Sequence, residues 1–279
     1  MRQVTLGLIQ MESFLGDKER NLALAIQLVR DAASQGAKLI CLPEMFVTGY
    51  HLDSLGDSLY SLSEELNGPT IAALGKLAKK INAYIIAPLA IKNPDHGLLL
   101  NVAVLIDDCG EVQGVYSKNH LFGDDDKYFT TSGEYPVFKT KYGTIGIMIC
   151  CDNNYPEPAR ILALQGAEII FTTAAWRLQE ADLWRLYNCC RAAENNVFVA
   201  GINAFGRLEG LFLFGHSMLV NPRGQILEEV NEDGSSVLVR TIDLDEIAAI
   251  RQHSPGLKDR HPQEYGALCQ PVDLNGILR

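Results

Sequence analysis

The segment at residues 146–157, Gly-Ile-Met-Ile-Cys-Cys-Asp-Asn-Asn-Tyr-Pro-Glu, constrains this chain more than any other feature. Its apolar run ends abruptly at Cys150, a polar turn follows, and Pro156-Glu157 is typical of the first turn of a helix. The segment therefore predicts a strand, a sharp corner and a helix, with a thiol at the corner. Because a helix N-terminus carries partial positive charge and free N–H groups, it can stabilise a thiolate and an oxyanion.

The composition is that of a globular protein with a substantial core. The 279 residues are 47% hydrophobic, and the formal net charge is −10. The acidic balance argues against a nucleic acid or an anionic membrane as partner, and no apolar stretch is long enough to span a bilayer. The first strand-like segment lacks the long apolar region and cleavage site of a signal peptide, so we expect a cytoplasmic protein.

The seven cysteines do not resemble the framework of a secreted, disulfide-rich protein. They include two adjacent pairs, at 150–151 and 189–190, and neighbouring cysteines seldom suit disulfide geometry. Neither Cys-x-x-Cys nor His-Glu-x-x-His occurs, and the six histidines are scattered. Nothing in the sequence therefore supports a metal ion or another cofactor, and we expect none.

Expected strands and helices alternate along most of the chain, which favours a layered α/β fold. No linker divides the chain, so we expect a single domain over residues 1–279, with an irregular tail from about residue 251. The expected strands cover residues 3–10, 37–42, 84–91, 101–107, 112–118, 143–150, 168–173, 197–203, 214–220, 225–230 and 236–242. The expected helices follow Asp17 and cover about 69–81, 157–165 and 179–195.

Two charged residues lie at the ends of other expected strands. Glu44, in Cys-Leu-Pro-Glu-Met-Phe, is a carboxylate in an apolar surround, which would make it a stronger base. Lys118, in Tyr-Ser-Lys-Asn-His-Leu-Phe, would favour a thiolate and stabilise negative charge on a carbonyl oxygen. Taken singly, these residues and Cys150 are more often structural or solvent-exposed. Together, they indicate a hydrolase with a cysteine nucleophile.

The three motifs resemble, in their order along the chain, those of the nitrilase superfamily, the carbon–nitrogen hydrolases. Strand-Pro-Glu, Lys-x-His-Leu-Phe and strand-Cys-x-Asp-x-x-Tyr-Pro-Glu carry the resemblance. Two later segments, Arg191-Ala-Ala-Glu-Asn195 and Gly215-His-Ser-Met-Leu-Val-Asn-Pro-Arg-Gly224, also look like that family. The resemblance extends from the first strand to about residue 245, and three motifs in order are more specific than any one of them.

The resemblance implies a Glu-Lys-Cys triad of Glu44, Lys118 and Cys150. It also implies a four-layer αββα sandwich that dimerises through helices into an αββα–αββα assembly. In the implied reaction, Glu44 takes the thiol proton while Cys150 attacks an amide carbonyl carbon. Lys118 and the backbone N–H of Cys151 hold the oxyanion, ammonia leaves, and water cleaves the thioester to a carboxylic acid.

Two positions depart from the pattern of that family. Members often carry a second glutamate seven residues before a glycine, and Asp126 takes that position here. Its shorter side chain would reposition the substrate, or a neighbour such as Asp125 would take over the role. Cys151 stands where an aromatic residue often follows the nucleophile, and the spacing to Asp152 favours Cys150 over Cys151 as nucleophile.

The sequence says less about the substrate than about the reaction. Cys151-Asp152 looks more like the amidase and carbamoylase branches than the nitrile-cleaving branch, where Trp-Glu commonly follows the nucleophile. In the family, the region of Trp176 and Arg177 borders the pocket, and Arg177 would suit a substrate carboxylate or equally the protein surface. We expect a small-molecule amide or carbamoyl substrate. An N-carbamoyl-amine or N-carbamoyl-amino-acid amidohydrolase and a catalytically silent binding protein on the same fold are the alternatives.

Overall fold

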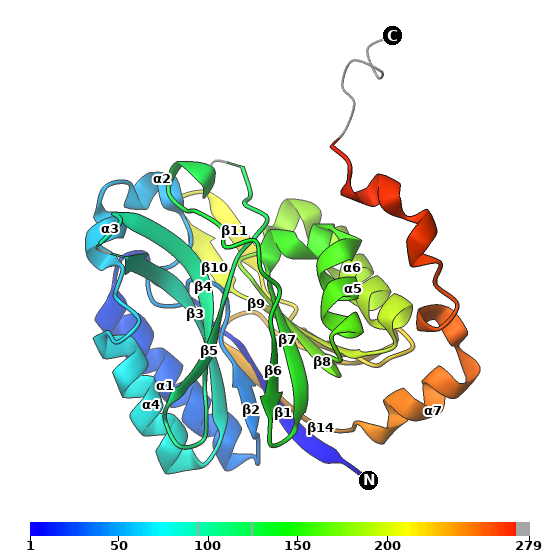
Figure 1. Ribbon diagram of the computed structural model, residues 1–279. Coiled ribbons are helices and arrows are strands. Elements are labelled where there is room, and N and C mark those ends of the chain that lie inside the picture. Colours follow the sequence, from blue (N-terminus) through cyan, green and yellow to red (C-terminus); the bar gives the residue numbers. More distant parts are fainter. Residues whose placement is uncertain (94, 124, 272–279) are drawn as a thin grey trace.

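Two six-stranded β-sheets face each other in this protein, and helices cover the outer face of each sheet (Figure 1). The computed structural model describes residues 1–93, 95–123 and 125–271. The first sheet has the order β14 (Ser236–Asp243), β1 (Gln3–Gln10), β2 (Leu39–Cys41), β3 (Tyr84–Asn93), β4 (Leu98–Ile106) and β5 (Val112–Ser117). The second has the order β13 (Ile226–Glu229), β12 (Met218–Val220), β9 (Phe198–Asn203), β8 (Ile169–Ala174), β7 (Gly143–Ile149) and β6 (Val137–Thr140). The αββα sandwich that the resemblance implies is thus confirmed.

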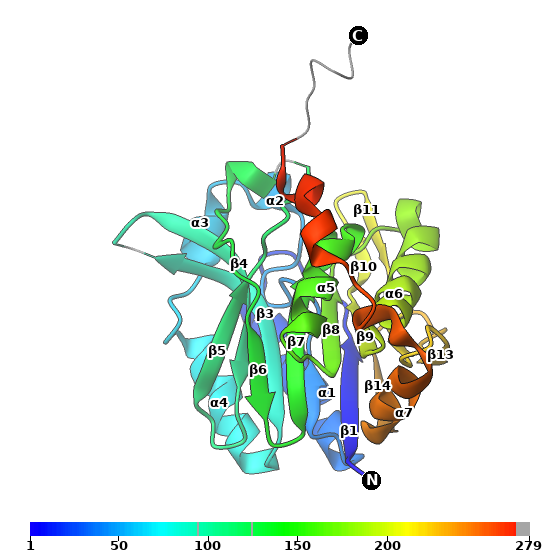
Figure 2. The same cartoon turned by 45° about the vertical axis from the view of Figure 1, so that its right-hand side comes forward.

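Four helices form the outer layers of the sandwich (Figure 2). The first sheet is covered by α1 (Lys18–Ser34) and α4 (Pro69–Ile81), and the second by α5 (Pro156–Leu164) and α6 (Ala181–Asn195). The Asp17 side chain caps α1, as expected, by accepting the N–H of Arg20 at 3.1 Å. Two shorter helices are α2 (Leu52–Leu55) and α3 (Ser58–Leu62). No helix in the described part of the chain is long and apolar enough to cross a membrane.

The parallel strands of both sheets end at the same edge of the sandwich. In the first sheet β1, β2 and β3 run parallel, and in the second β7, β8 and β9 do. Two polar contacts join the sheets at this edge. Thr173 Oγ1 donates to the carbonyl oxygen of Leu42 at 2.9 Å, and Tyr116 OH donates to Asp152 Oδ2 at 2.6 Å. The loops that follow these strands therefore meet in one place, which is where open α/β sheets usually carry their sites.

The strands differ from the expected ones at β6 and after β9. The expected strand 214–220 is broken at Gly215 and His216, whose φ angles of +72° and +57° turn the chain out of the extended conformation. The residues before the break form β11 (Leu211–Phe214), which pairs in a hairpin with β10 (Phe205–Leu208). Neither this hairpin nor β6 is expected from the sequence, because each of these strands has only four residues.

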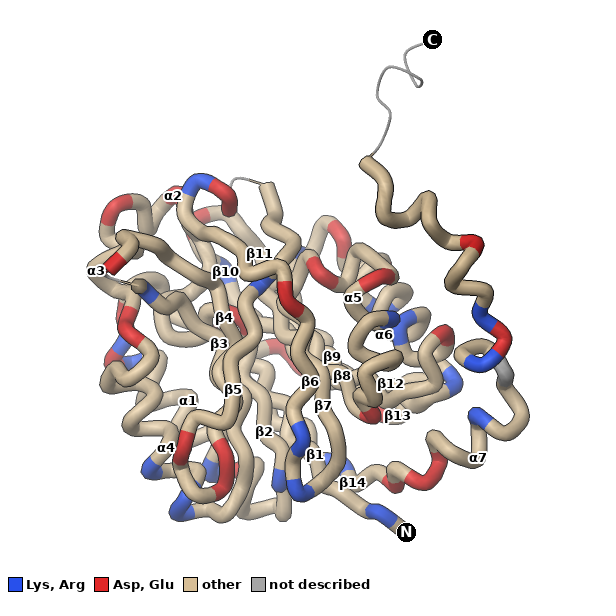
Figure 3. Tube along the Cα trace, in the orientation of Figure 1, with Lys and Arg blue, Asp and Glu red and all other residues tan. Residues whose placement is uncertain are grey.

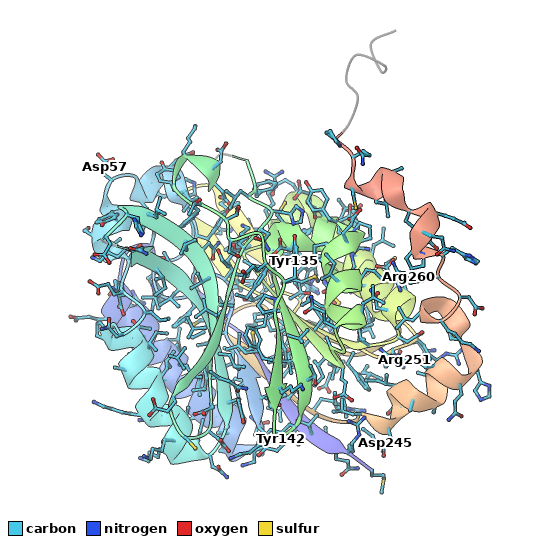
Figure 4. All side chains as sticks on the ribbon, in the orientation of Figure 1. Asp57, Tyr135, Tyr142, Asp245, Arg251 and Arg260 are labelled. Carbon is cyan, nitrogen blue, oxygen red and sulfur yellow. The ribbon has the colours of Figure 1, made fainter. Side chains whose placement is uncertain are left out.

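The end of the chain is more regular than the expected irregular tail. The helix α7 (Asp245–His253) follows β14, and the tail beyond it carries both basic and acidic residues (Figure 3). Asp245, labelled in Figure 4, starts α7 and pairs with Arg2 at 3.1 Å. Short 3₁₀ turns follow at 255–257, 262–264 and 266–269. In both ribbon views the tail runs past α5 and α6 on the outside of the sandwich.

Candidate active site

Glu44, Lys118 and Cys150 lie at the edge of the sandwich where the parallel strands of both sheets end. Glu44 follows β2, Lys118 follows β5, and Cys150 follows β7. Cys150 lines a cavity of about 340 Å³, whereas Glu44 and Lys118 are 1% and 0% exposed. The fold therefore brings three residues that are far apart in the sequence to the same edge of the sandwich.

The corner at Cys150 is sharp and strained. Its φ of +47° lies in the left-handed region, which residues with a Cβ adopt at a cost of about 1–3 kcal/mol. Asp152 holds the corner, because its Oδ2 accepts the N–H of Ile149 at 2.9 Å. Its other oxygen accepts the N–H of His120 at 3.0 Å, which also ties down the loop beside Lys118. A turn of this kind points a side chain outwards at the end of a strand, as a nucleophile requires.

Lys118 is a fully buried ammonium between two carboxylates. Its Nζ lies 2.9 Å from Glu44 Oε1 and 2.9 Å from Asp125 Oδ2. Burial by itself lowers the pKa of Lys118, but the negative charges of Glu44 and other neighbours outweigh burial and raise the pKa well above its usual value. Lys118 therefore stays positively charged at the closed side of the site.

Three donors hold the Glu44 carboxylate in place. Oε1 accepts from Lys118 Nζ at 2.9 Å and from Asn101 Nδ2 at 2.7 Å, and Oε2 accepts the N–H of Ala175 at 2.9 Å. Asn101 was missed by the sequence analysis. The signal was a single amide in the apolar run Leu-Leu-Leu-Asn-Val-Ala-Val-Leu of β4. Because Ala175 follows β8, the two sheets both contribute donors to this one carboxylate.

Asp125, and not Asp126, reaches the site. The carboxylate of Asp125 is buried and contacts Lys118, and its Oδ1 accepts from Tyr50 OH at 2.6 Å. Asp126 lies on the same 3₁₀ turn but is exposed. The shorter side chain of Asp126 left two possibilities, and the contact between Asp125 and Lys118 fits the one in which Asp125 takes the role of the second glutamate. Tyr50, which lines the cavity, was also missed by the sequence analysis.

The thiol of Cys150 is held in its neutral form. Burial raises its pKa well above the usual value, and the negative charge of Glu44 raises it further. Lys118 acts in the opposite direction but does not prevail. Lys118 therefore favours the thiolate, as expected, but burial and Glu44 together outweigh its effect on the pKa of Cys150. The neighbouring Cys151 is also neutral, because burial raises its pKa to about 11.

The cavity is also lined by Trp176, Arg177 and Cys151, among others. Trp176 is buried, and its backbone N–H donates to Asn203 Oδ1 at 2.7 Å. The guanidinium of Arg177 forms an ion pair with Glu180 and lies 4.8 Å from the centre of the Phe122 ring. Trp176 and Arg177, which the resemblance places beside the pocket, thus border the same cavity as Cys150, and so does Cys151.

Among the described residues, one group of three side chains is close enough to share a metal ion. It consists of Asp107, Asp108 and Cys109 in the turn between β4 and β5. Asp108 is already paired with Lys141 at 2.6 Å. None of these residues lines the cavity at Cys150.

Comparisons with known proteins give one consistent result. The sequence profile of the family described as Carbon-nitrogen hydrolase matches residues 5–252. A probable nitrilase of Schizosaccharomyces pombe is 30% identical over 96% of this chain and 100% of that protein. An N-carbamoylputrescine amidase of Arabidopsis thaliana is 32% identical over 90% of this chain and 91% of that protein.

A solved structure gives the same result for the fold. The amidase of Nesterenkonia sp. AN1, in a mutant form, superposes with a TM-score of 0.83 at 25% identity, over 95% of this chain and 96% of that chain. In that structure, the active-site cysteine carries the covalently added acetamide moiety of fluoroacetamide.

We predict that Cys150 is a neutral thiol at pH 7, because its pKa lies well above the ordinary value of 9.0. The ultraviolet thiolate absorbance of the wild-type protein minus that of Cys150→Ala should be absent at pH 7 and appear only above pH 9. Cys151→Ala is the matched control, and its subtraction should also give no signal at pH 7. A thiolate signal at pH 7 that depends on Cys150 would contradict the dominance of burial.

Proposed function

The chain belongs to the carbon–nitrogen hydrolase family, and we propose that it hydrolyses the amide bond of a small molecule through a cysteine thioester. One observation carries the proposal: the buried ion pair of Glu44 and Lys118, with a distance of 2.9 Å, lies at the same edge of the sandwich as Cys150, which lines the cavity. A covalent route of this kind divides one difficult hydrolysis into two easier steps.

A neutral thiol needs a base at the moment of attack, and Glu44 fits that role. Its carboxylate takes the proton from Cys150 Sγ while the sulfur bonds to the carbonyl carbon. When the C–N bond breaks, Glu44 returns this proton to the leaving nitrogen, and ammonia departs. Glu44 then takes a proton from water, the water oxygen bonds to the thioester carbon, and the proton passes to the departing sulfur of Cys150.

Lys118 and the backbone N–H of Cys151 stabilise the oxyanion in the proposed mechanism. Lys118 is suited to this role because its raised pKa keeps it positively charged. Since it is buried, water screens its charge less than at the surface, which strengthens its interaction with the oxyanion. The N–H of Cys151 belongs to the 3₁₀ turn Cys150–Asn154 that begins at the nucleophile. Asp125 supports Lys118 from the other side, in the position where Asp126 does not reach.

We further propose that Arg177 binds a carboxylate on the substrate. One nitrogen of its guanidinium is held by Glu180, while its buried Nε has no hydrogen-bond partner among the described residues. An N-carbamoyl amine is the second candidate, since a relative at 32% identity is named N-carbamoylputrescine amidase. An N-carbamoyl diamine keeps one free ammonium group, which Glu180 would recognise instead, since Glu180 also lines the cavity.

We also propose that the protein is a cytoplasmic homodimer. All seven cysteines are free, which suits a reducing compartment. The outer side of α5 and α6 exposes apolar residues, with Leu164 at 48% and Leu186 at 53% exposed. The tail runs past the same two helices (Figure 1), and we place the contact with a second copy on this side of the sandwich.

The proposed reaction predicts ammonia release that depends on Cys150. The wild-type protein should release ammonia from at least one class among small amides, ω-amides of dicarboxylic acids, N-carbamoyl amino acids, N-carbamoyl amines and nitriles. Cys150→Ala should release none, and Glu44→Gln should be slower by about 10²–10⁴-fold because it removes the base. Cys151→Ala should keep turnover because its backbone N–H remains. Retained turnover in Cys150→Ala would exclude the mechanism, and silence of the folded wild-type protein would favour a binding protein.

The proposed role of Arg177 predicts a change in KM that depends on the charge of the substrate. Arg177→Ala should raise KM about tenfold or more for ω-amides of dicarboxylic acids, because a charge-assisted contact is lost. KM for uncharged amides should change little. Arg240→Ala, which removes an exposed arginine on β14, is the control. An unchanged KM for the acidic amides in Arg177→Ala would favour the N-carbamoyl amine instead.

The proposed dimer predicts a molar mass of about twice 30.7 kDa by light scattering after gel filtration. Leu186→Glu places a charge on the apolar side of α6 and should shift the protein to the monomer mass. Leu98→Glu is the matched control, because Leu98 is 43% exposed on β4 in the opposite sheet. A wild-type monomer, or a dimer that Leu186→Glu leaves intact, would exclude this interface.

A further inference from the structure

Asn101 is a buried amide in an otherwise apolar strand. It is 1% exposed in the middle of β4, and Leu99 and Ala103, which share its face of the strand, belong to apolar clusters. Placing an amide in such surroundings is unfavourable unless its polar atoms find partners. The partners of Asn101 therefore indicate what this residue does.

The partners of Asn101 are two proposed catalytic residues. Its Nδ2 donates to Glu44 Oε1 at 2.7 Å, and its backbone carbonyl accepts the N–H of Lys118 at 2.9 Å. The second contact follows from the strand register, because Val102 pairs with Ser117 and so brings Asn101 next to Lys118. One residue thus contacts the side chain of the base and the backbone that carries the ammonium.

The orientation of the amide is determined by Glu44. A carboxylate can only accept hydrogen bonds, so the nitrogen of the amide must face it. As a result, Asn101 Oδ1 is buried without a hydrogen-bond partner among the described residues. A leucine, which has the same branching and the same number of side-chain heavy atoms, would leave no such oxygen, so packing alone does not explain an asparagine at this position.

We propose that Asn101 is a positioning residue, which holds the Glu44 carboxylate in the orientation that receives the proton of Cys150. This inference rests on the proposed cysteine-dependent hydrolysis. Lys118 and Asn101 contact Oε1 from different strands, so they fix the plane of the carboxylate together with the N–H of Ala175 on Oε2. Without Asn101, Glu44 keeps its ion pair with Lys118 but loses one of the three donors that set its angle.

The first test compares Asn101→Leu with a matched buried asparagine. Asn188 on α6 is also fully buried, donates through Nδ2 to the carbonyl oxygen of Trp184 at 2.8 Å, and has an unpartnered Oδ1. We expect Asn101→Leu to lower kcat about tenfold or more, with KM within about twofold and the melting temperature unchanged or raised. Asn188→Leu should keep kcat. Asn101→Asp, which has the same shape but no donor towards Glu44, should lower kcat at least as much as Asn101→Leu.

The second test is a double-mutant cycle that needs no substrate. The rate at which iodoacetamide alkylates Cys150 at pH 7 is measured by mass spectrometry for wild type, Asn101→Leu, Glu44→Gln and the double variant. If Asn101 acts through Glu44, Asn101→Leu slows alkylation in the wild-type background and has no further effect in the Glu44→Gln background.

The outcomes separate this inference from the proposed function. An unchanged kcat in Asn101→Leu, or an equal slowing in both backgrounds of the cycle, would overturn the positioning role while hydrolysis stands. A non-additive cycle in a protein that releases no ammonia from any amide would support the positioning role and reject the proposed function. If Asn188→Leu lowers kcat as much as Asn101→Leu does, the effect is that of losing any buried asparagine, and the positioning role of Asn101 is overturned.

Discussion

The buried ammonium of Lys118 is the interaction on which the geometry of the site depends. A lysine that is 0% exposed keeps its charge only if carboxylates surround it, and Glu44 and Asp125 do so at 2.9 Å each. Glu44 comes from the end of β2, and Asp125 from the loop beyond β5. The requirement to pair this one charge therefore draws two distant segments of the first sheet together.

The same charges set the state of the nucleophile. Burial raises the pKa of the Cys150 thiol, and the charges of Glu44 and Asp125 raise it further against the opposing effect of Lys118. A neutral thiol is protected from oxidation and needs a base beside it to react. In the proposed mechanism the two charged residues therefore have separate roles: Glu44 transfers the proton, and Lys118 stabilises the negative charge that develops on the substrate oxygen.

The sandwich explains how such precision is maintained. Glu44 and Lys118 belong to the first sheet, whereas Cys150 and the Ala175 N–H that holds Glu44 belong to the second. The bond from Thr173 to Leu42 and the bond from Tyr116 to Asp152 lock the two sheets together next to these residues. A displacement of one sheet against the other would therefore disturb the base and the nucleophile together.

The sequence by itself determined the alternation of strands and helices, the corner at Cys150 and the two other motifs, because hydrophobic periodicity and turn residues are local signals. The tertiary structure alone decided that Asp125 is buried and Asp126 exposed, that Asn101 meets Glu44 across 57 residues of sequence, and that the Cys150 thiol is neutral. Burial and the identity of a partner depend on segments that only folding brings together, so no local pattern could encode them.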